Sequence, residues 1–176
     1  MSHVAKKNSP PKLSLTVQYA SSAQHLPTRA QFRRWIKVAL HPQGVRRRVP
    51  GSFAATLPLQ RDAIITLRIV DEVEGRELNK NYRGKDYATN VLTFVYDGAE
   101  STLQPLSGDV VICAPVVERE ATAQHKDLPA HYAHLTLHAA LHLQGYQHEN
   151  DADAAEMEEL ETALMLELRY SDPYRT

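Results

Sequence analysis

The spacing of three histidines around a glycine constrains this chain more than any other feature of its sequence. His138 and His142 lie four residues apart, so a helix places them on one face about one turn from each other. Gly145 follows three residues later and can end that helix, because glycine tolerates the left-handed conformation of a C-cap. The chain can then turn back and bring His148 to the same face. The sequence therefore predicts a helix that ends at a three-histidine site.

Three imidazoles that leave one coordination position open are typical of a catalytic zinc site rather than a closed structural one. The spacing is that of the long zinc-peptidase motif H-E-x-x-H-x-x-G-x-x-H, but Ala139 stands where the peptidases have their catalytic Glu. Zinc suits such a site better than nickel, cobalt or copper. The competing interpretation is a histidine-rich helix packed against acids such as Glu149. Six of the nine histidines lie between His125 and His148, which favours the metal site.

The surroundings of the three histidines are less well determined by the sequence. His134 lies four residues before His138, and we expect it at the surface or next to the metal ligands rather than among them. A metal-bound histidine usually donates its second ring N–H to a carboxylate or carbonyl group. Glu149, Asp151 and Asp153 follow the third histidine and are equal candidates for that partner.

Length and composition favour one globular domain. The 176 residues suffice for a sizeable core, and 43% hydrophobic and 23% charged residues are ordinary for a soluble protein. No apolar stretch approaches the length of a membrane span, and the N-terminus lacks the apolar core of a secretory signal. The single cysteine, Cys113, excludes an intramolecular disulfide and agrees with a reducing cytosol. We expect a cytoplasmic protein with a flexible tail at residues 1–11 and one metal-dependent hydrolase domain at 12–176.

The charges are divided unequally along the chain. Residues 1–90 carry 16 Lys and Arg against 6 Asp and Glu, whereas residues 91–176 carry 4 against 15. Such a division favours a polyanionic partner on one face. The two halves attracting each other across the fold is an equally good explanation, because folded geometry decides whether the basic residues cluster.

The hydrophobic patterns predict an α+β fold. The order is strand, helix, strand, helix, two strands and three helices, which gives a small mixed β-sheet packed with helices and a zinc site at the end of a helix. The strands are expected near 12–20, 63–70, 90–96 and 108–114. The helices are expected near 26–41, 71–82, 115–126 and from 128 through the first two motif histidines, followed by a last helix that Asp151 or Asp153 caps. The stretch 43–60, with its Pro, Gly and Arg46–Arg48, indicates a loop or insertion.

Helical spacing also predicts which side chains face the core. The expected inward residues are Phe32, Trp35, Ile36, Ala39 and Leu40, then Val73 and Leu78, then Met157, Leu160, Leu164 and Leu168. Asp71 is a candidate N-cap for the second helix.

A basic segment between the second helix and the third strand is a candidate phosphate-binding site. Lys80, Arg83 and Lys85 lie within six residues, beside Tyr82 and Tyr87. Arginine makes bidentate contacts with phosphate, and tyrosine offers a stacking face for a base. Taken alone, the segment is better explained as a turn with solvated cations. A metal site in the same protein favours the phosphate interpretation.

Several motifs resemble those of one family, the YbeY-type rRNA maturation factors, which are single-strand-specific metal-dependent endoribonucleases. The family pattern H-G-x-L-H-L-x-G-Y-D-H is matched by HAALHLQGYQH at 138–148. The pattern L-N-x-x-Y-R-x-K-D-x-P-T-N-V-L-S-F is matched by LNKNYRGKDYATNVLTF at 78–94, and L-G-D-I-x-I-C by the run LSGDVVICAP. The resemblance also extends to the C-terminal run EMEELETALMLELRYSDPY.

The resemblance implies an activity and a set of site residues. It implies one zinc ion held by His138, His142 and His148, a functional arginine at Arg83, and a fold related to the metzincin core. The implied role is 16S rRNA 3′-end maturation and quality control of the small ribosomal subunit. The expected partners are single-stranded RNA, the 16S rRNA precursor and the small subunit, with no membrane and no DNA.

In this interpretation the three histidines and Arg83 are the catalytic residues. Water or hydroxide at the zinc would attack, or assist attack on, the phosphodiester. Arg83 would stabilise charge on the phosphoryl oxygens, and Lys80 and Lys85 would hold the backbone nearby.

The chain also departs from the family pattern. Ala139 replaces a Gly, Gln147 an Asp and Ala88 a Pro. Because neither Ala139 nor Gln147 can act as a general base, the base is left open. Two alternatives follow: a non-catalytic ribosome assembly factor with a structural zinc, and a zinc peptidase, against which Ala139 argues.

Overall fold

The computed structural model describes residues 9–44, 47–48, 56–96 and 104–175. Its main sheet has the strand order β1-β4-β6-β5. The three parallel strands are β1 (Leu13–Ala20), β4 (Ala63–Val70) and β6 (Leu106–Cys113), and the edge strand β5 (Val91–Val95) runs antiparallel to β6. The predicted mixed sheet is therefore confirmed.

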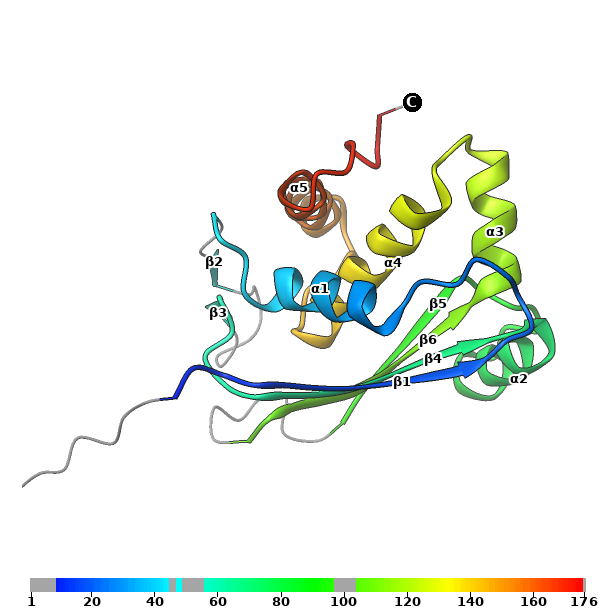
Figure 1. Ribbon diagram of the computed structural model, residues 1–176, viewed down its shortest axis with the longest axis horizontal. Helices are drawn as coiled ribbons and strands as arrows, with labels where there is room; N and C mark the ends of the chain where they lie inside the picture. The colour runs from blue at the N-terminus through cyan, green and yellow to red at the C-terminus, as the bar shows by residue number, and fades with distance from the viewer. Residues whose placement is uncertain (1–8, 45–46, 49–55, 97–103, 176) are drawn as a thin grey trace, which may run out of the picture.

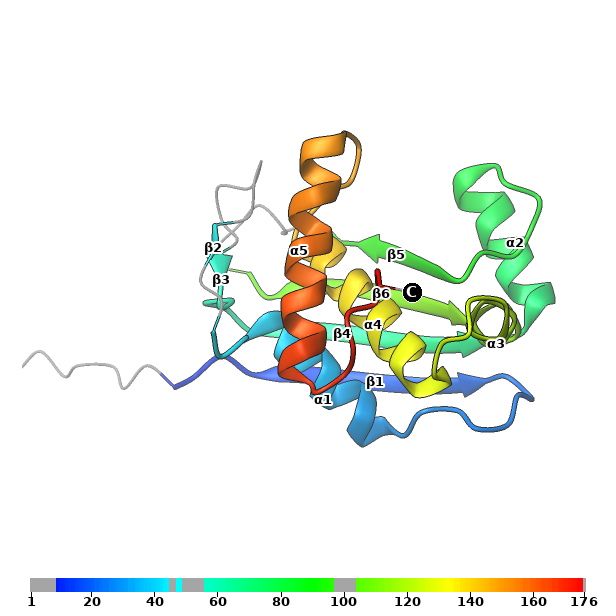
Figure 2. The ribbon, with the colours of Figure 1, turned by 90° about the horizontal axis from the view of Figure 1, so that it is seen from above.

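Five helices pack on or beside this sheet within the described residues. They are α1 (Arg29–Leu40), α2 (Glu72–Arg83), α3 (Ala114–Ala123), α4 (Leu128–Leu143) and α5 (Asp151–Glu167). Helices α1, α4 and α5 lie on one side of the sheet (Figure 1), whereas α2 and α3 lie at the end toward which the parallel strands run (Figure 2). The element order and the α+β class agree with the sequence prediction.

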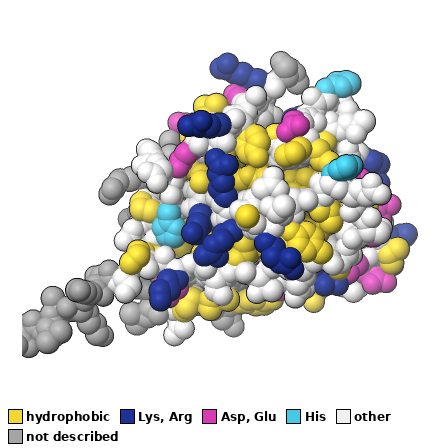
Figure 3. Space-filling model, in the orientation of Figure 1, with side chains coloured by type: hydrophobic (Ala, Val, Ile, Leu, Met, Phe, Trp, Pro, Cys, Tyr) yellow, Lys and Arg dark blue, Asp and Glu magenta, His cyan; other side chains and the backbone are white. Residues whose placement is uncertain are grey.

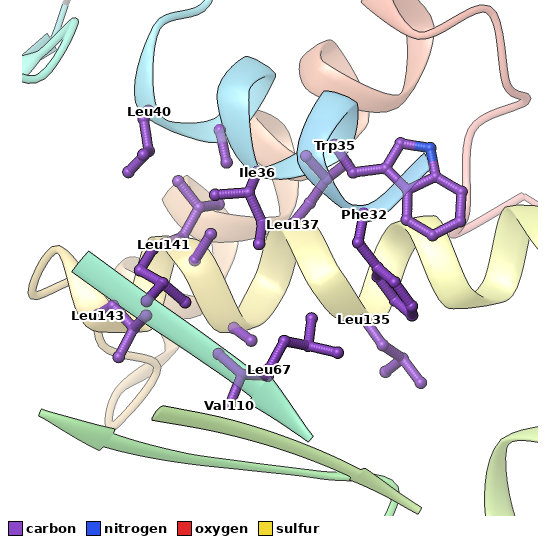
Figure 4. Packing of buried hydrophobic residues seen from close by; sticks show 14 of the residues in the cluster. Phe32, Trp35, Ile36, Leu40, Leu67, Val110, Leu135, Leu137, Leu141 and Leu143 are labelled. Carbon is purple, nitrogen blue, oxygen red and sulfur yellow. The ribbon is translucent and has the colours of Figure 1, made fainter. Parts of the chain in front are cut away.

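The core lies between the sheet and helices α1 and α4. Alternate residues of β4, including Ile65, Leu67 and Ile69, point to this side and are almost fully buried. Figure 4 shows side chains of α1, such as Trp35, meeting those of α4, such as Leu137, above the two central strands. Ten of the sixteen residues of α4 are buried, so α4 has core on several sides.

The predicted apolar stripes are correct for α1 and α5 but partly wrong for α2. Val73 is 75% exposed, while Leu78 is half-buried. The reason is Gly75, which lets α2 approach the sheet so closely that an added Cβ would lie 3.2 Å from Cys113 Sγ. The inward stripe of α2 therefore runs through Gly75, Leu78 and the fully buried Asn79.

Asp71 is the N-cap residue of α2, as predicted, whereas the predicted cap of α5 is wrong. The carboxylate of Asp71 makes no capping bond and instead accepts hydrogen bonds from the hydroxyls of Ser21 and Ser22. Helix α5 begins at Asp151, but its capping side chain is Asn150, which accepts from the Asp153 amide at 2.9 Å.

The remaining predictions on chain organisation concern segments that are described only in part. Residues 1–8 of the predicted 1–11 tail lie outside the described residues, as do 45–46 and 49–55 of the predicted loop or insertion. The ends of that stretch pair as a short antiparallel ladder of β2 (Arg47–Arg48) with β3 (Thr56–Leu57). Among the described helices, none is both long and apolar enough to cross a membrane.

Replacing Gly108 with alanine is expected to destabilise the protein by about 1–3 kcal/mol, because the site has no room for a side chain. A Cβ there would lie 2.6 Å from the carbonyl oxygen of Phe94 and 2.6 Å from Leu143 Cδ2. The Phe94 oxygen is backbone of β5 and cannot rotate away. Chemical denaturation measures the effect, with Gly44→Ala as the control, since an added carbon at Gly44 meets nothing within 4 Å. Equal unfolding free energies for the two variants would contradict this packing.

Candidate metal centre and its cavity

The three motif histidines come together at the C-terminal end of α4. His138 and His142 lie on one face of the helix, with their Nε2 atoms 3.0 Å apart. The ring of His148 lies 4.9 Å from that of His142 and 5.7 Å from that of His138, between ring centroids. One ring nitrogen from each histidine lies within 4.8 Å of the others. The geometry that the spacing predicts is therefore present.

The turn after α4 is what returns His148 to the helix. Gly145 has a φ of 100°, which a side chain would strain, and its amide donates to the His142 carbonyl at 3.0 Å. The buried Gln144 holds the turn against α1 by donating to the Ala39 carbonyl at 3.1 Å. The buried ring of Tyr146 anchors the other side. The predicted helix end at the glycine is thus realised by a turn fixed in the core.

The hydrogen bonds of the two helical histidines aim their free nitrogens into the site. His142 Nδ1 donates to the Tyr146 carbonyl at 2.8 Å, and His138 Nδ1 donates to the carboxylate of Glu161. Each Nε2 then carries no proton and has a free lone pair, and the two Nε2 atoms face each other. Adjacent lone pairs are stable only with a positive charge between them, so this donor set fits a bound metal ion.

Burial and neighbouring charge keep His142 neutral and Glu161 ionised. Burial, reinforced by the nearby His138, lowers the pKa of His142 to about 4. His142 is therefore neutral at neutral pH, which is the form that ligates metal. Burial opposes ionisation of Glu161, but hydrogen bonds from His134 and His138 outweigh it and hold its pKa at about 2. A buried negative charge consequently lies directly behind His138.

The carboxylate partner is not one of the three acids that the sequence offered. Glu149, Asp151 and Asp153 do not contact the histidine rings, and Glu161 takes that place.

The sequence interpretation missed Glu161, although the sequence contains a signal for it. This glutamate lies within the apolar stripe of α5 that Met157, Leu160 and Leu164 define. An acid in such a stripe has to be buried, and a buried acid needs partners. His134 is one of those partners. It therefore lies next to the three motif histidines, which is one of the two positions that the sequence predicted for it.

A cavity of about 530 Å³ opens in front of the histidines and also contains Arg83. Its wall is formed by His138, His142 and His148, by Tyr82 and Arg83 at the end of α2, and by residues 89–94 in and before β5. Arg83 ends α2 because Gly84 takes the left-handed conformation, with a φ of 68°. The fold thus brings the guanidinium-bearing Arg83 to the cavity of the three histidines from a segment more than fifty residues away in the chain.

The loop between α2 and β5, which follows Arg83, is fastened to the helix. The buried side chain of Asn79 donates to the Tyr87 carbonyl at 2.7 Å, which ties the loop back to the helix. Arg76 and Lys80 hold Asp86, at 2.8 Å and 3.6 Å. Lys80 and Lys85, the other predicted phosphate contacts, are exposed nearby but do not line the cavity.

A second basic region covers the outer face of α1, which contains no acidic residue. Arg29, Arg33, Arg34 and Lys37 are all exposed there, and no carboxylate among the described residues pairs with them. Figure 3 shows Lys and Arg side chains gathered over the middle of this face. The charge division in the sequence therefore produces a true basic surface. It lies over the β1 edge of the sheet, whereas the cavity adjoins the opposite edge, β5 (Figure 2).

Comparisons with known proteins agree with this architecture. The family model described as "Endoribonuclease YbeY" matches residues 27–169. A protein of that name from Nitrosospira multiformis is 51% identical, over 94% of this chain and 83% of the relative. Another from Cupriavidus metallidurans is 48% identical, over 94% of this chain and 75% of the relative.

One solved structure shares the fold. The solution structure of the Thermotoga maritima protein TM1509 superposes with a TM-score of 0.52 at 19% identity, covering 92% of this chain and all of that one.

Proposed function

Since this chain belongs to the YbeY family of endoribonucleases, we propose that it is a zinc-dependent endoribonuclease that cuts single-stranded RNA. The observation that carries the proposal is the shared cavity, in which Arg83 and the three histidines face the same space. We further propose 16S rRNA 3′-end maturation as its reaction in the cell, quality control of the small ribosomal subunit as its wider role, and the cytoplasm as its location.

The roles of the side chains follow from their positions. A zinc ion held by His138, His142 and His148 would supply a Lewis acid for phosphodiester hydrolysis. Arg83 binds the phosphate through its guanidinium fork and stabilises the charge that develops on the non-bridging oxygens. The exposed ring of Tyr82, which packs edge-on against Phe94 at the cavity wall, offers a stacking face for a base. A single strand is favoured because its backbone can bend into the cavity.

The cavity gives no support to peptidase chemistry. Ala139, at the position of the peptidase glutamate, is fully buried, and no acidic side chain is among the described residues that line the cavity. A carboxylate base for water is therefore missing from the described wall. Phosphodiester cleavage depends more on positioning and charge stabilisation, which Arg83 supplies.

RNA cleavage by the zinc-loaded protein, compared with the chelator-treated protein, tests the proposal. The substrate is a labelled single-stranded RNA, with the same sequence annealed into a duplex as the comparison. We expect metal-dependent cleavage of the single strand and little of the duplex. Equal cleavage before and after metal removal would reject zinc dependence.

A non-catalytic assembly factor with a structural zinc is the second candidate, because the basic surface on α1 lies away from the cavity. Such a surface fits the phosphate backbone of ribosomal RNA without placing it at the metal. The same surface is compatible with an enzyme that docks on the subunit through α1 and cuts at the cavity. The two candidates therefore differ in the role of Arg83 rather than in that of α1.

Replacing both Arg34 and Lys37 with glutamine is expected to weaken binding to the small ribosomal subunit while leaving cleavage of a short RNA unchanged. The loss of two phosphate contacts should reduce the slope of log affinity against log salt by about 1.4–1.8. Binding measured over a series of salt concentrations tests this. Arg119→Gln is the control, because Arg119 already pairs with Glu72. An unchanged salt slope in the double variant would show that the α1 surface does not contact the subunit.

A further inference from the structure

Glu161 is a fully buried carboxylate in α5 that three donors surround. Its Oε1 accepts from His138 Nδ1, and its Oε2 accepts from His134 Nε2 at 2.9 Å and from the Tyr174 hydroxyl. Its side chain is 0% exposed. An ionised carboxylate in such a place is costly unless hydrogen bonds satisfy both oxygens, and here they do. The three hydrogen bonds therefore stabilise Glu161 in its ionised form.

Tyr174 reaches this carboxylate from the C-terminal segment that follows α5. The segment turns at Arg169, whose φ is 65°, and the Tyr174 amide then donates to Asp172 Oδ1 at 2.9 Å. The Tyr174 ring packs edge-on against the His134 ring, with 5.3 Å between centroids. Burial and the adjacent Glu161 raise the pKa of Tyr174 far above its usual value, so its hydroxyl keeps its proton. The C-terminal segment is thus fastened to the back of the metal site.

His138 and His142, the two histidines on α4, differ in the group that accepts a hydrogen bond from Nδ1. His142 donates to a backbone carbonyl, which is neutral, whereas His138 donates to a buried carboxylate. A carboxylate partner fixes which ring nitrogen carries the proton and makes the other nitrogen more basic. His138 is therefore the ligand whose strength and orientation depend on charge behind it.

We infer that Glu161 and Tyr174 are positioning residues of the metal centre: Glu161 orients His138 toward the metal, and Tyr174, from the C-terminal segment, holds Glu161 in place. The inference rests on the proposed function, since it assigns these residues to the same zinc site. It makes residues 169–175 part of the metal centre, although none of them is a ligand. Loss of such a carboxylate partner typically lowers metal affinity about 10–100-fold.

The test is the zinc dissociation constant, measured by competition with a chromophoric chelator in the absence of RNA. Glu161→Gln keeps the shape of the side chain and removes its charge, and we expect zinc affinity to fall about 10–100-fold. Tyr174→Phe removes one donor to the carboxylate and should cause a smaller loss. Glu158→Gln, on the exposed face of the same helix, and Tyr170→Phe, in the same segment, are the controls and should bind zinc like the wild type.

A double-mutant cycle shows whether Tyr174 acts through Glu161. If it does, the combined variant should bind zinc about as weakly as Glu161→Gln alone, because the hydroxyl has lost its charged partner. Independent, additive losses would contradict the role assigned to Tyr174.

Thermal unfolding of the metal-free variants separates positioning from folding. A merely structural role predicts a lower melting temperature with unchanged zinc affinity, and that result would overturn the inference. If Glu161→Gln does not fold, the comparison of Tyr174→Phe with Tyr170→Phe decides the question.

The outcomes also separate this inference from the proposed function. A protein whose zinc affinity depends on Glu161 but which does not cut RNA refutes only the nuclease proposal. A protein that cuts RNA with zinc, and whose affinity is unaffected by Glu161→Gln, refutes only the positioning role.

Discussion

Replacing His142 with alanine is expected to remove zinc and abolish RNA cleavage. Zinc binding at structural sites is worth about 10–16 kcal/mol at neutral pH, so one ligand among three or four contributes about 3–5 kcal/mol. Losing it corresponds to a roughly 10²–10⁴-fold weaker site. The Nε2 of His142 lies 3.0 Å from that of His138, so its removal opens the centre of the donor set. Zinc content and cleavage rate, measured on the same purified sample, test this expectation.

The fold should survive this substitution. His142 is in the last turn of α4, alanine is a strong helix former, and the core side chains of that turn, Leu141 and Leu143, remain. The matched control is His125→Asn, which changes an exposed histidine distant from the site at a left-handed φ of 53° that asparagine tolerates. If His142→Ala cut RNA as fast as this control, the cleavage would come from another nuclease in the preparation.

The three-histidine cluster was predictable because its determinants are local. The spacing of His138 and His142 fixes their common face once the segment is helical, and Gly145 marks where the helix must end. The same holds for the strands and for the stripe of α1, whose five predicted inward residues are all buried. Periodicity and turn chemistry act over a few residues, so one sequence suffices to recognise them.

Features that depend on contacts between distant segments could not be predicted as well from the sequence. Val73 fits a helical stripe, but the approach of α2 to the sheet is set by Gly75 against Cys113, a contact between separate elements. Glu161 contacts His138 from a separate helix, α5, whereas the sequence interpretation considered only acids close in sequence to His148. Only the family resemblance predicted that Arg83 acts together with the histidines. Their common cavity is created where α4 packs against β5, and no local sequence pattern shows such a contact.

Replacing Arg83 with alanine is expected to lower RNA cleavage about 10²–10³-fold, the usual effect of removing one donor that stabilises transition-state charge. Zinc content should stay at the wild-type level, because Arg83 lines the cavity but is not among the three clustered histidines. Arg83→Lys keeps the charge but loses the planar fork, so we expect it to recover only part of the rate. Glu77→Gln, an exposed substitution on the same helix, is the control for effects on α2.

The same variant distinguishes the two candidate functions in the cell. A nuclease that depends on Arg83 should leave unprocessed 16S rRNA 3′ ends when Arg83→Ala is the only copy, even though zinc and the α1 surface are intact. An assembly factor with a structural zinc should show normal 3′ ends in those cells. It should lose function instead when Arg34 and Lys37 on α1 are neutralised. Because Arg83 and α1 lie near opposite edges of the sheet, each substitution leaves the other surface unchanged, and the two results can be read independently.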